Sequence, residues 1–343
     1  MAWKHSKKSA PGKAAFAPPE KQTQKRFGMD GISEEPVIDY LEHAPVAPFV
    51  TFTDGLFQSL PRGSVHAPLD VTTARRDKVP HYIRFQCPQQ LSVEEQAVLF
   101  YLCQRATQAG SALNPAHPNF PEYAAGLGIS GYEVMPDIVG YRVRYSEIVA
   151  GVGLKPTGPN TQAVVARLNR LAQVTMSRFD LPDGDNPNTH RTNLIGVLKR
   201  DSGVVAVLLN PESSACVTTY GSGVVWINMR EQKLLASKPS RRLHAWLSGW
   251  AKTGDQPAKI RVESVVKHIW GAQECSRTLR NSRMEILRHA IGEIAALPGW
   301  TCHLHDGMVW VRKPLFVGMT KKDVLSRILQ VETTSDLVGS LSD

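Results

Sequence analysis

The sequence predicts an α+β protein with two tandem winged helix-turn-helix domains and a disordered basic N-terminal tail. Two observations support this fold class. A short strand, a short helix, a glycine-rich turn, a longer helix and a β-rich segment follow one another between residues 141 and 209. The same order returns between residues 224 and 313 and ends in a hairpin. We therefore divide the chain into a tail (1–48), a first domain (49–221), a second domain (222–313) and a C-terminal extension (314–343).

The tail carries most of the net charge. The chain has 343 residues and a formal net charge of +9, and residues 1–28 alone hold seven Lys or Arg side chains and one Glu. Residues 1–48 are rich in Lys, Pro, Ala and Gln and lack apolar periodicity, so we expect them to be disordered. Such a tail attracts phosphates without sequence preference. The segments 141–200 and 257–313 are also basic, which indicates a nucleic-acid partner, whereas 29–140 is acidic.

Composition excludes several classes of protein. The chain is 42% hydrophobic, and its five cysteines are spread along the sequence without a C-x-x-C pair. This pattern encodes neither a disulfide framework nor a zinc site. The longest aliphatic run, 204–209, is too short to cross a bilayer, and residues 1–16 lack the apolar core of a secretory signal. We expect a cytoplasmic protein with reduced thiols and no membrane partner.

The first domain begins with a strand and a capped helix. Residues 79–85 alternate as a strand does, and Ser92 with Glu95 has the spacing of a capping box before a helix that ends near residue 108. The helix-turn-helix follows, with Asn160 as the expected cap of its second helix. Its strand is expected at 141–144, its short helix at 146–152, the turn at 153–159 and the longer helix at 160–173. Two wing segments follow at 174–179 and 192–209, and the turn residues 182–187 lie between them.

The longer helix of the first domain has a buried side and a polar side. Val164, Val165, Leu168 and Leu171 share the apolar stripe. The polar side carries few cations, so we expect it to contact the DNA backbone more than base edges. The DNA-contacting candidates of this domain are Gln162, Arg167, Asn169, Arg170 and Gln173.

The second domain repeats the pattern. We expect a strand at 224–229, a helix at 238–250 and a second strand at 259–261. A short helix at 262–271 and a long helix at 276–297 follow. Pro298 and Gly299 end the long helix. Asp306-Gly307 between alternating segments 300–305 and 308–313 is a strong signal for a hairpin, which would be the wing.

The long helix of the second domain is the predicted base-reading element. Leu279, Ile286, Ala290, Ile294 and Leu297 fall on one side of the helical wheel and define its expected core face. Arginine can bond guanine O6 and N7, and asparagine can bond adenine N6 and N7, in the major groove. The wing adds cations for phosphate contacts. The DNA-contacting candidates of this domain are Arg277, Arg280, Asn281, Met284, Arg288, Arg312 and Lys313.

Motifs for catalysis are weak. His303-Leu304-His305 matches the metal-binding pair of nicking enzymes, but that chemistry needs a tyrosine nucleophile and the last tyrosine is Tyr220. The sequence has no G-x-x-x-x-G-K-[ST] motif, which argues against a P-loop motor. We expect no enzymatic activity, no cofactor and no metal, and we interpret the two histidines as one face of the wing.

A series of motifs resembles the replication initiator C proteins (RepC) of IncQ-type plasmids. The match runs in order over residues 49–313, and the tail and the segment after Pro314 depart from it. The motifs are Gly55-Leu-Phe-Gln-Ser-Leu-Pro-Arg-Gly63, Leu69-Asp-Val71, Leu168-Asn-Arg-Leu171, Val207-Leu-Leu-Asn-Pro211, Arg242-Leu-His-Ala-Trp-Leu-Ser-Gly-Trp250, Val265-Val-Lys-His-Ile-Trp-Gly271 and Leu287-Arg-His-Ala-Ile-Gly-Glu-Ile-Ala-Ala-Leu-Pro-Gly-Trp300.

The resemblance implies a bacterial, plasmid-associated initiator made of tandem winged helices. Such proteins bind direct repeats (iterons) in double-stranded origin DNA, open adjacent AT-rich DNA, and recruit a separate helicase and primase. Two alternatives remain open. One is a winged-helix repressor that regulates its own operon, although a repressor is usually a symmetric dimer on a palindrome. The other is an adaptor that docks a helicase through the acidic segment 29–140 and binds DNA weakly.

Overall fold

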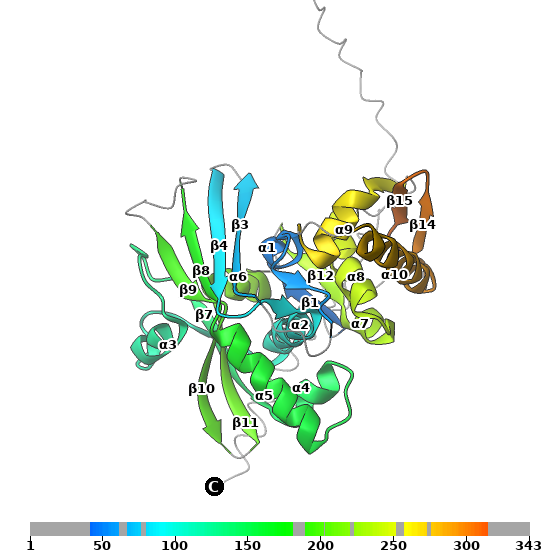
Figure 1. Ribbon diagram of the computed structural model, residues 1–343. Coiled ribbons are helices and arrows are strands. Elements are labelled where there is room, and N and C mark those ends of the chain that lie inside the picture. The colour runs from blue at the N-terminus through cyan, green and yellow to red at the C-terminus, as the bar shows by residue number, and fades with distance from the viewer. Residues whose placement is uncertain are drawn as a thin grey trace, which may run out of the picture. The chain divides into compact units, whose positions relative to one another are not determined.

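The computed structural model describes residues 42–61, 67–76, 80–180, 189–201, 203–219, 223–251, 257–272 and 276–314. The predicted disordered tail up to residue 41, the wing turn at 182–187 and the C-terminal extension beyond Pro314 lie outside these residues. Within them, the chain has a mixed α/β fold (Figure 1). No helix among the described residues is long and apolar enough to span a membrane.

The helix α2 (Val93–Ala109) lies at the centre of a first hydrophobic core. The predicted capping box is present at its start, because the Glu95 carboxylate accepts from the Ser92 N–H and the Ser92 hydroxyl caps the first turn. Leu99 and Leu102 of this helix are completely buried. The other helices in this part of the chain are α1 (Pro48–Phe52), α3 (Phe120–Leu127), α4 (Tyr145–Gly151), α5 (Gly158–Ala172), α6 (Pro211–Thr219) and α7 (Met229–Leu234).

Two antiparallel four-stranded sheets contribute to this part of the fold. The order of the first is β3-β4-β8-β9 and the order of the second is β10-β11-β7-β6. Their strands are β3 (Leu69–Arg76), β4 (Pro80–Cys87), β8 (Thr175–Phe179), β9 (His190–Asn193), β10 (Ile195–Asp201), β11 (Val204–Leu209), β7 (Ile138–Arg144) and β6 (Ser111–Leu113). A short parallel pair joins β2 (Phe57–Gln58) to β5 (Leu91–Ser92).

The strand β1 (His43–Val46) corrects the predicted extent of the disordered tail. It pairs antiparallel with β12 (Val225–Asn228), and all four of its residues are buried. We expected disorder as far as residue 48, which is wrong for residues 42–48. Four residues that include a proline carry no strand periodicity, and their partner strand lies far along the chain, so local pattern does not indicate the pairing.

A second hydrophobic core contains α8 (Lys238–Trp250), α9 (Val262–Trp270), α10 (Arg277–Ala295) and a three-stranded sheet. The order of this sheet is β13-β15-β14, and its strands are β13 (Ala258–Arg261), β15 (Met308–Arg312) and β14 (Thr301–His305). The helix α8 has the bounds that the sequence predicts, and Ser276, where the long helix was predicted to begin, is the N-cap of α10. Asp306 and Gly307 both have positive φ, which confirms the predicted hairpin turn.

The end of α1 and the residues directly after it contact α8 and α9 and so connect the two cores. The completely buried Arg242 of α8 donates to the Thr51 and Thr53 carbonyls at the end of α1, over 3.3 and 3.2 Å. Asp54 then accepts from Nδ1 of His268 at 2.8 Å and pairs with Lys267 of α9 at 3.0 Å. These contacts come from one turn of chain, so the packing of α8 and α9 depends on that turn.

The buried His268 makes the stability of this contact sensitive to acid. Burial and the nearby Arg242 guanidinium lower the pKa of His268 to about 3, so its imidazole is neutral at pH 7 and Nδ1 donates to Asp54. An unfolded chain protonates the same imidazole near its ordinary pKa of about 6.5, so stability is present above pH 6.5 and is lost as the pH falls toward 3. Urea unfolding should show that the protein loses about 2 kcal/mol from this group between pH 7 and pH 5.

The variant His268→Gln provides the control for this acid sensitivity. Glutamine cannot be protonated, so the pH-dependent part of the free energy of unfolding should shrink by that amount between pH 7 and pH 5, whatever the variant costs at pH 7. The other histidines are present in both proteins, so they do not contribute to the difference between the two pH profiles. Parallel pH profiles for the two proteins would show that His268 is protonated in the folded state.

Candidate nucleic-acid interface

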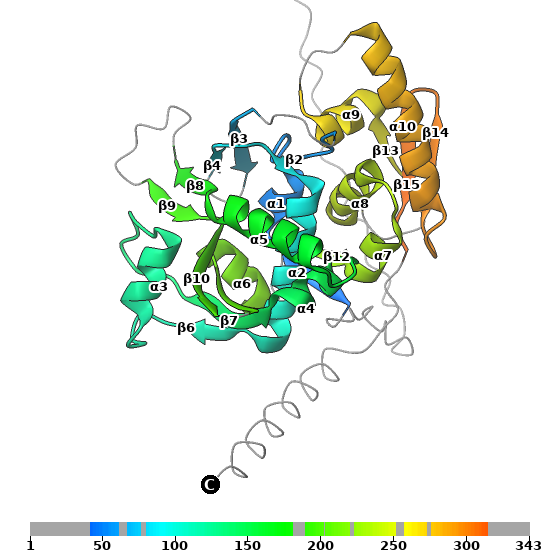
Figure 2. The ribbon, with the colours of Figure 1, turned by 60° about the horizontal axis from the view of Figure 1, so that its bottom comes forward.

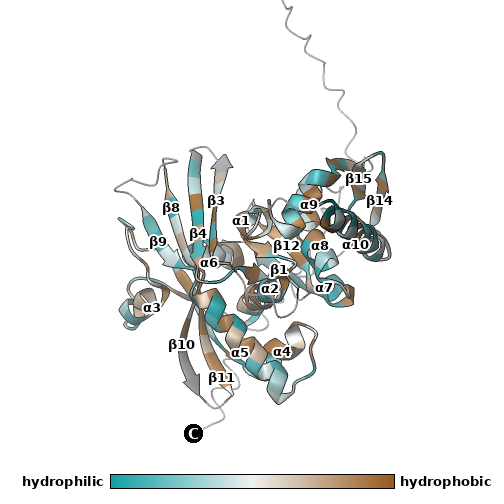
Figure 3. Ribbon diagram, viewed as in Figure 1, coloured by the Kyte–Doolittle hydropathy of each residue, from teal (hydrophilic) through white to brown (hydrophobic). Residues whose placement is uncertain are grey.

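The N-terminal turns of α10 stand clear of the rest of the protein. Every residue from 276 to 282 is exposed, whereas Leu287, Ile291 and Ile294 further along the helix are buried in the second core. In Figure 2 this end of α10 extends beyond α9, and in Figure 3 much of the α10 ribbon has the teal colour of hydrophilic residues. A helix end of this kind can enter a groove of DNA without disturbing the core that holds it.

The structure places four of the predicted DNA-contacting residues of α10 on its surface. Arg277, Arg280, Asn281 and Arg288 are all exposed. Thr278 and Ser282, which were not predicted as contact residues, are also exposed on the turns that carry Arg277 and Asn281. A wheel centred on the true core residues identifies both, because they lie opposite to that core face. The exposed turns therefore combine guanidinium, amide and hydroxyl groups.

The predicted core face of α10 is partly wrong. Leu279 and Ile286 are 45% and 40% exposed, although we placed them in the core. Met284, which we expected to face DNA, is half-buried and packs against the second core. The predicted helical wheel placed Leu279 and Ile286 on the inward side, but among the described residues no other element covers the first turns of the helix. The apolar stripe that is covered begins at Met284.

Two cations near this surface serve the fold. The Arg283 guanidinium lies over the Trp270 ring, 5.6 Å from its centroid, and so joins α10 to α9. Lys313 was predicted to contact phosphate, but it is buried and its Nζ donates to the Ser248 carbonyl at 2.6 Å. Desolvation lowers its pKa to about 8. Lys313 thus anchors the end of the hairpin to α8, while the neighbouring Arg312 is exposed.

The helix α5 presents a weaker surface. Its cap is Thr157 and its first residue is Gly158, so the helix begins before the predicted cap Asn160. Gln162 and Gln173 are exposed, and Arg167 and Asn169 are partly exposed. Arg170, which we expected to face DNA, forms an ion pair with the buried Glu95 of α2, with Nε 2.9 Å from Oε1. Arg170 therefore holds α5 against α2.

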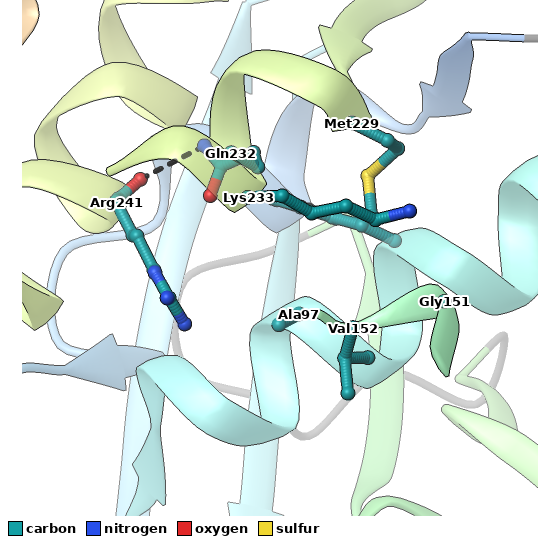
Figure 4. A pocket seen from close by; sticks show the side chains of 8 residues that line it. Ala97, Gly151, Val152, Met229, Gln232, Lys233 and Arg241 are labelled. Atoms are coloured by element: carbon teal, nitrogen blue, oxygen red, sulfur yellow. Dashed lines mark hydrogen bonds between the residues drawn. The ribbon is translucent and has the colours of Figure 1, made fainter. Parts of the chain in front are cut away.

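The structure contains a small cavity and a larger groove. The cavity in Figure 4 lies between α2, α4, α7 and α8, and its volume of about 10 Å³ accommodates about one water molecule. Gln232 is one of the residues that line it, and the Gln232 Nε2 donates to the Arg241 carbonyl at 3.1 Å. A larger groove of about 370 Å³ lies beside α3, between Tyr123 and Leu208. In the part of the chain that the structure describes, no three His, Cys, Asp or Glu side chains gather as metal ligands do.

Comparisons with known proteins agree with the sequence motifs. The family described as replication protein C (RepC) matches residues 38–310 of this chain. A search of curated proteins finds no match. The crystal structure of selenomethionine derivatives of domains 2 and 3 of RctB has a TM-score of 0.50 and 10% identity, and the match covers 80% of this chain and 100% of that one. This likeness concerns the fold.

Two further solved structures are similar at lower scores. A second crystal structure of RctB domains 2–3 has a TM-score of 0.46 and 8% identity, with 78% of this chain and 97% of that chain covered. A crystal structure of the Pi initiator protein in complex with iteron DNA has a TM-score of 0.37 and 14% identity, with 51% of this chain and 81% of that chain covered.

Proposed function

Because this chain belongs to the replication protein C (RepC) family, we propose that it is a plasmid replication initiator that binds the direct repeats of its origin in a sequence-specific way. The observation that carries this proposal is the exposed end of α10, where Arg280 and Asn281 lie on turns that no other described element covers. The chain acts through two winged helix-turn-helix units, one containing α4 and α5 and the other containing α9 and α10.

Each part of the proposed interface has a separate physical role. The N-terminal turns of α10 enter the major groove, where Arg277 and Arg280 read guanine and Asn281 reads adenine. Arg312 of the hairpin holds a phosphate and sets the register of the complex. On α5, Gln162 and Arg167 contact a neighbouring segment of the same duplex. Two unlike units in one chain suit an asymmetric direct repeat better than a palindrome.

We further propose that binding opens the neighbouring AT-rich DNA and that a separate helicase and primase are then recruited. Bending a duplex costs a few kcal/mol, which the contacts of two DNA-binding units can offset. In this proposal, the chain supplies recognition and distortion in the bacterial cytoplasm and has no enzymatic activity of its own.

The test is fluorescence-anisotropy binding of the full chain to the direct repeats nearest its gene and to a shuffled duplex, in about 150 mM salt. We expect the repeats to bind about a thousand-fold more tightly than the shuffled duplex, with one monomer per repeat. Equal and salt-sensitive binding to both duplexes would contradict the proposal. Binding as a dimer to a palindrome would instead indicate a repressor.

Arg312 and Lys313 are adjacent in sequence but should behave differently in this assay. Arg312→Ala removes an exposed cation, so it should weaken binding to all sequences alike and reduce the slope of log K against log salt by about 0.9. Lys313→Met removes a buried ammonium and should leave that slope unchanged. The salt dependence of both variants is measured on the repeat and on the shuffled duplex. A reduced slope for Lys313→Met would show that Lys313 reaches phosphate in the complex.

A further inference from the structure

One face of the sheet β13-β15-β14 points away from the second core. Val309 and Val311 of β15 lie on its inner face, with α10 on the same side. Alternate residues of the three strands therefore point outward. We call this surface the outer sheet face and define it by Lys259, Arg261, His303, His305 and Trp310. All of these are exposed except Trp310, which is half-buried.

The strand pairing aligns three of these residues in a row. Lys259 and His303 are the direct partners of Trp310 on the two neighbouring strands. The Lys259 Nζ lies 3.9 Å from the centroid of the Trp310 ring. The His303 ring is nearly parallel to the indole, at 14° and with 5.9 Å between ring centroids. The row thus presents two flat rings and a cation toward solvent.

The position of Trp310 is not explained by packing. Its ring lies on the solvent side of the sheet, outside the second core. The indole Nε1 has no hydrogen-bond partner among the described residues, although a covered indole N–H normally finds one. A half-buried indole that lies outside the core, beside the exposed and nearly parallel His303 ring, is better explained by a ligand that offers flat groups.

The charge of the outer sheet face indicates an anionic ligand. Lys259 and Arg261 are exposed cations, and the three strands contain no Asp or Glu. Asp306 lies in the hairpin turn, and its Oδ2 is 3.1 Å from Nε2 of His305. Single-stranded nucleic acid offers both bases that stack and phosphates that pair with cations. The proposed duplex interface uses α10 and Arg312, whereas the outer sheet face shares no residue with it, so the two are separate surfaces.

We propose that the outer sheet face binds single-stranded DNA, with bases stacked on Trp310 and His303 and phosphates held by Lys259 and Arg261. Lys259 moves from the indole to a phosphate when a base takes its place. The inference rests on the proposed function, since an initiator that opens AT-rich DNA exposes a single strand beside the bound repeats. It also gives a role to the His303-Leu304-His305 pattern that needs no metal.

The test uses the full chain and two fluorescein-labelled probes of equal length, a 20-nucleotide oligo-dT and an abasic oligomer with the same phosphates. Stacking of one base is worth about 5- to 150-fold in affinity. We expect oligo-dT to bind at least about ten-fold more tightly than the abasic oligomer. Trp310→Leu should abolish this preference, whereas Trp310→Phe should keep most of it because the ring remains.

Control variants separate this surface from the duplex interface. Thr301→Ala changes the same sheet face without altering a ring or a charge, so it should keep the preference for oligo-dT. Trp310→Leu should change binding to the direct-repeat duplex by less than about two-fold. His303→Leu, at an exposed position, provides a second test if Trp310→Leu does not fold, and it should reduce the preference.

Three outcomes would overturn the inference. These are equal binding of both probes by the wild-type chain, no binding of either probe, and an unchanged preference in Trp310→Leu or His303→Leu. In each case the outer sheet face would not be a binding site for single-stranded DNA, and it would instead contact a protein partner or serve packing. The proposed function has a separate readout, since loss of discrimination between repeat and shuffled duplex would contradict it while leaving the oligo-dT preference intact.

Discussion

Replacing Arg280 and Asn281 together by alanine is expected to remove most of the discrimination between the direct repeats and a shuffled duplex. Each bidentate contact to a base contributes about 1–3 kcal/mol of discrimination, so losing both should cost about 2–6 kcal/mol on the repeats. Both side chains are exposed on turns without core contacts, so the variant should fold normally. Binding to the shuffled duplex should persist, because phosphate contacts of the tail and the wing remain.

Anisotropy titrations on both duplexes measure this effect. Arg230→Ala is a matched control, since Arg230 is an arginine of α7 whose side chain is 75% exposed. The control should retain the discrimination of the wild-type chain. The single variant Arg280→Ala should cost about 1–3 kcal/mol and relax one base position of the repeat. If the double variant weakens both duplexes equally, α10 holds phosphates and does not read bases.

Replacing Arg242 by alanine should destabilise the fold by about 4 kcal/mol. The side chain is completely buried, and its truncation leaves a cavity together with two buried carbonyls, those of Thr51 and Thr53, without their donor. Desolvation lowers the pKa of Arg242 to about 9, so the guanidinium is still charged at pH 7. The end of α1 therefore loses a charge-assisted contact to α8.

Equilibrium urea unfolding tests this prediction, with Lys267→Ala as the control. Lys267 pairs with Asp54 in the same contact region, but both side chains are about half exposed, so its loss should cost about 1 kcal/mol or less. A small effect of Arg242→Ala, comparable to that of Lys267→Ala, would show that water satisfies the two carbonyls. Arg242→Met separates the cost of the cavity from the cost of the lost hydrogen bonds, because methionine fills most of the volume without supplying a donor.

Much of the fold could be predicted from the sequence, because its signals are local. The capping box of Ser92 and Glu95, the turn at Asp306-Gly307 and the bounds of α8 each depend on a few neighbouring residues. The motif series also predicted the replication protein family that the comparison identifies. These features depend on short-range chemistry that a single sequence displays directly.

The parts that were missed depend on long-range partners. The strand β1 exists because β12 lies beside it. Arg170 and Lys313 look like surface cations in sequence, but Glu95 and the Ser248 carbonyl hold them. Hydrophobic periodicity gives the phase of a helix only where another element covers it. For that reason Met284 was assigned to the wrong side of α10.

The pairing of β1 with β12 also affects how the chain emerges during synthesis. The partners lie about 180 residues apart, so β1 has no partner until the segment that forms β12 has been made. At synthesis rates of about 5–20 residues per second, this delay is roughly 10–35 seconds. During that interval the first core lacks one of its strands, and His43–Val46 is an unpaired strand that other chains can bind. The first half of this protein is thus completed only after its second half has begun to appear.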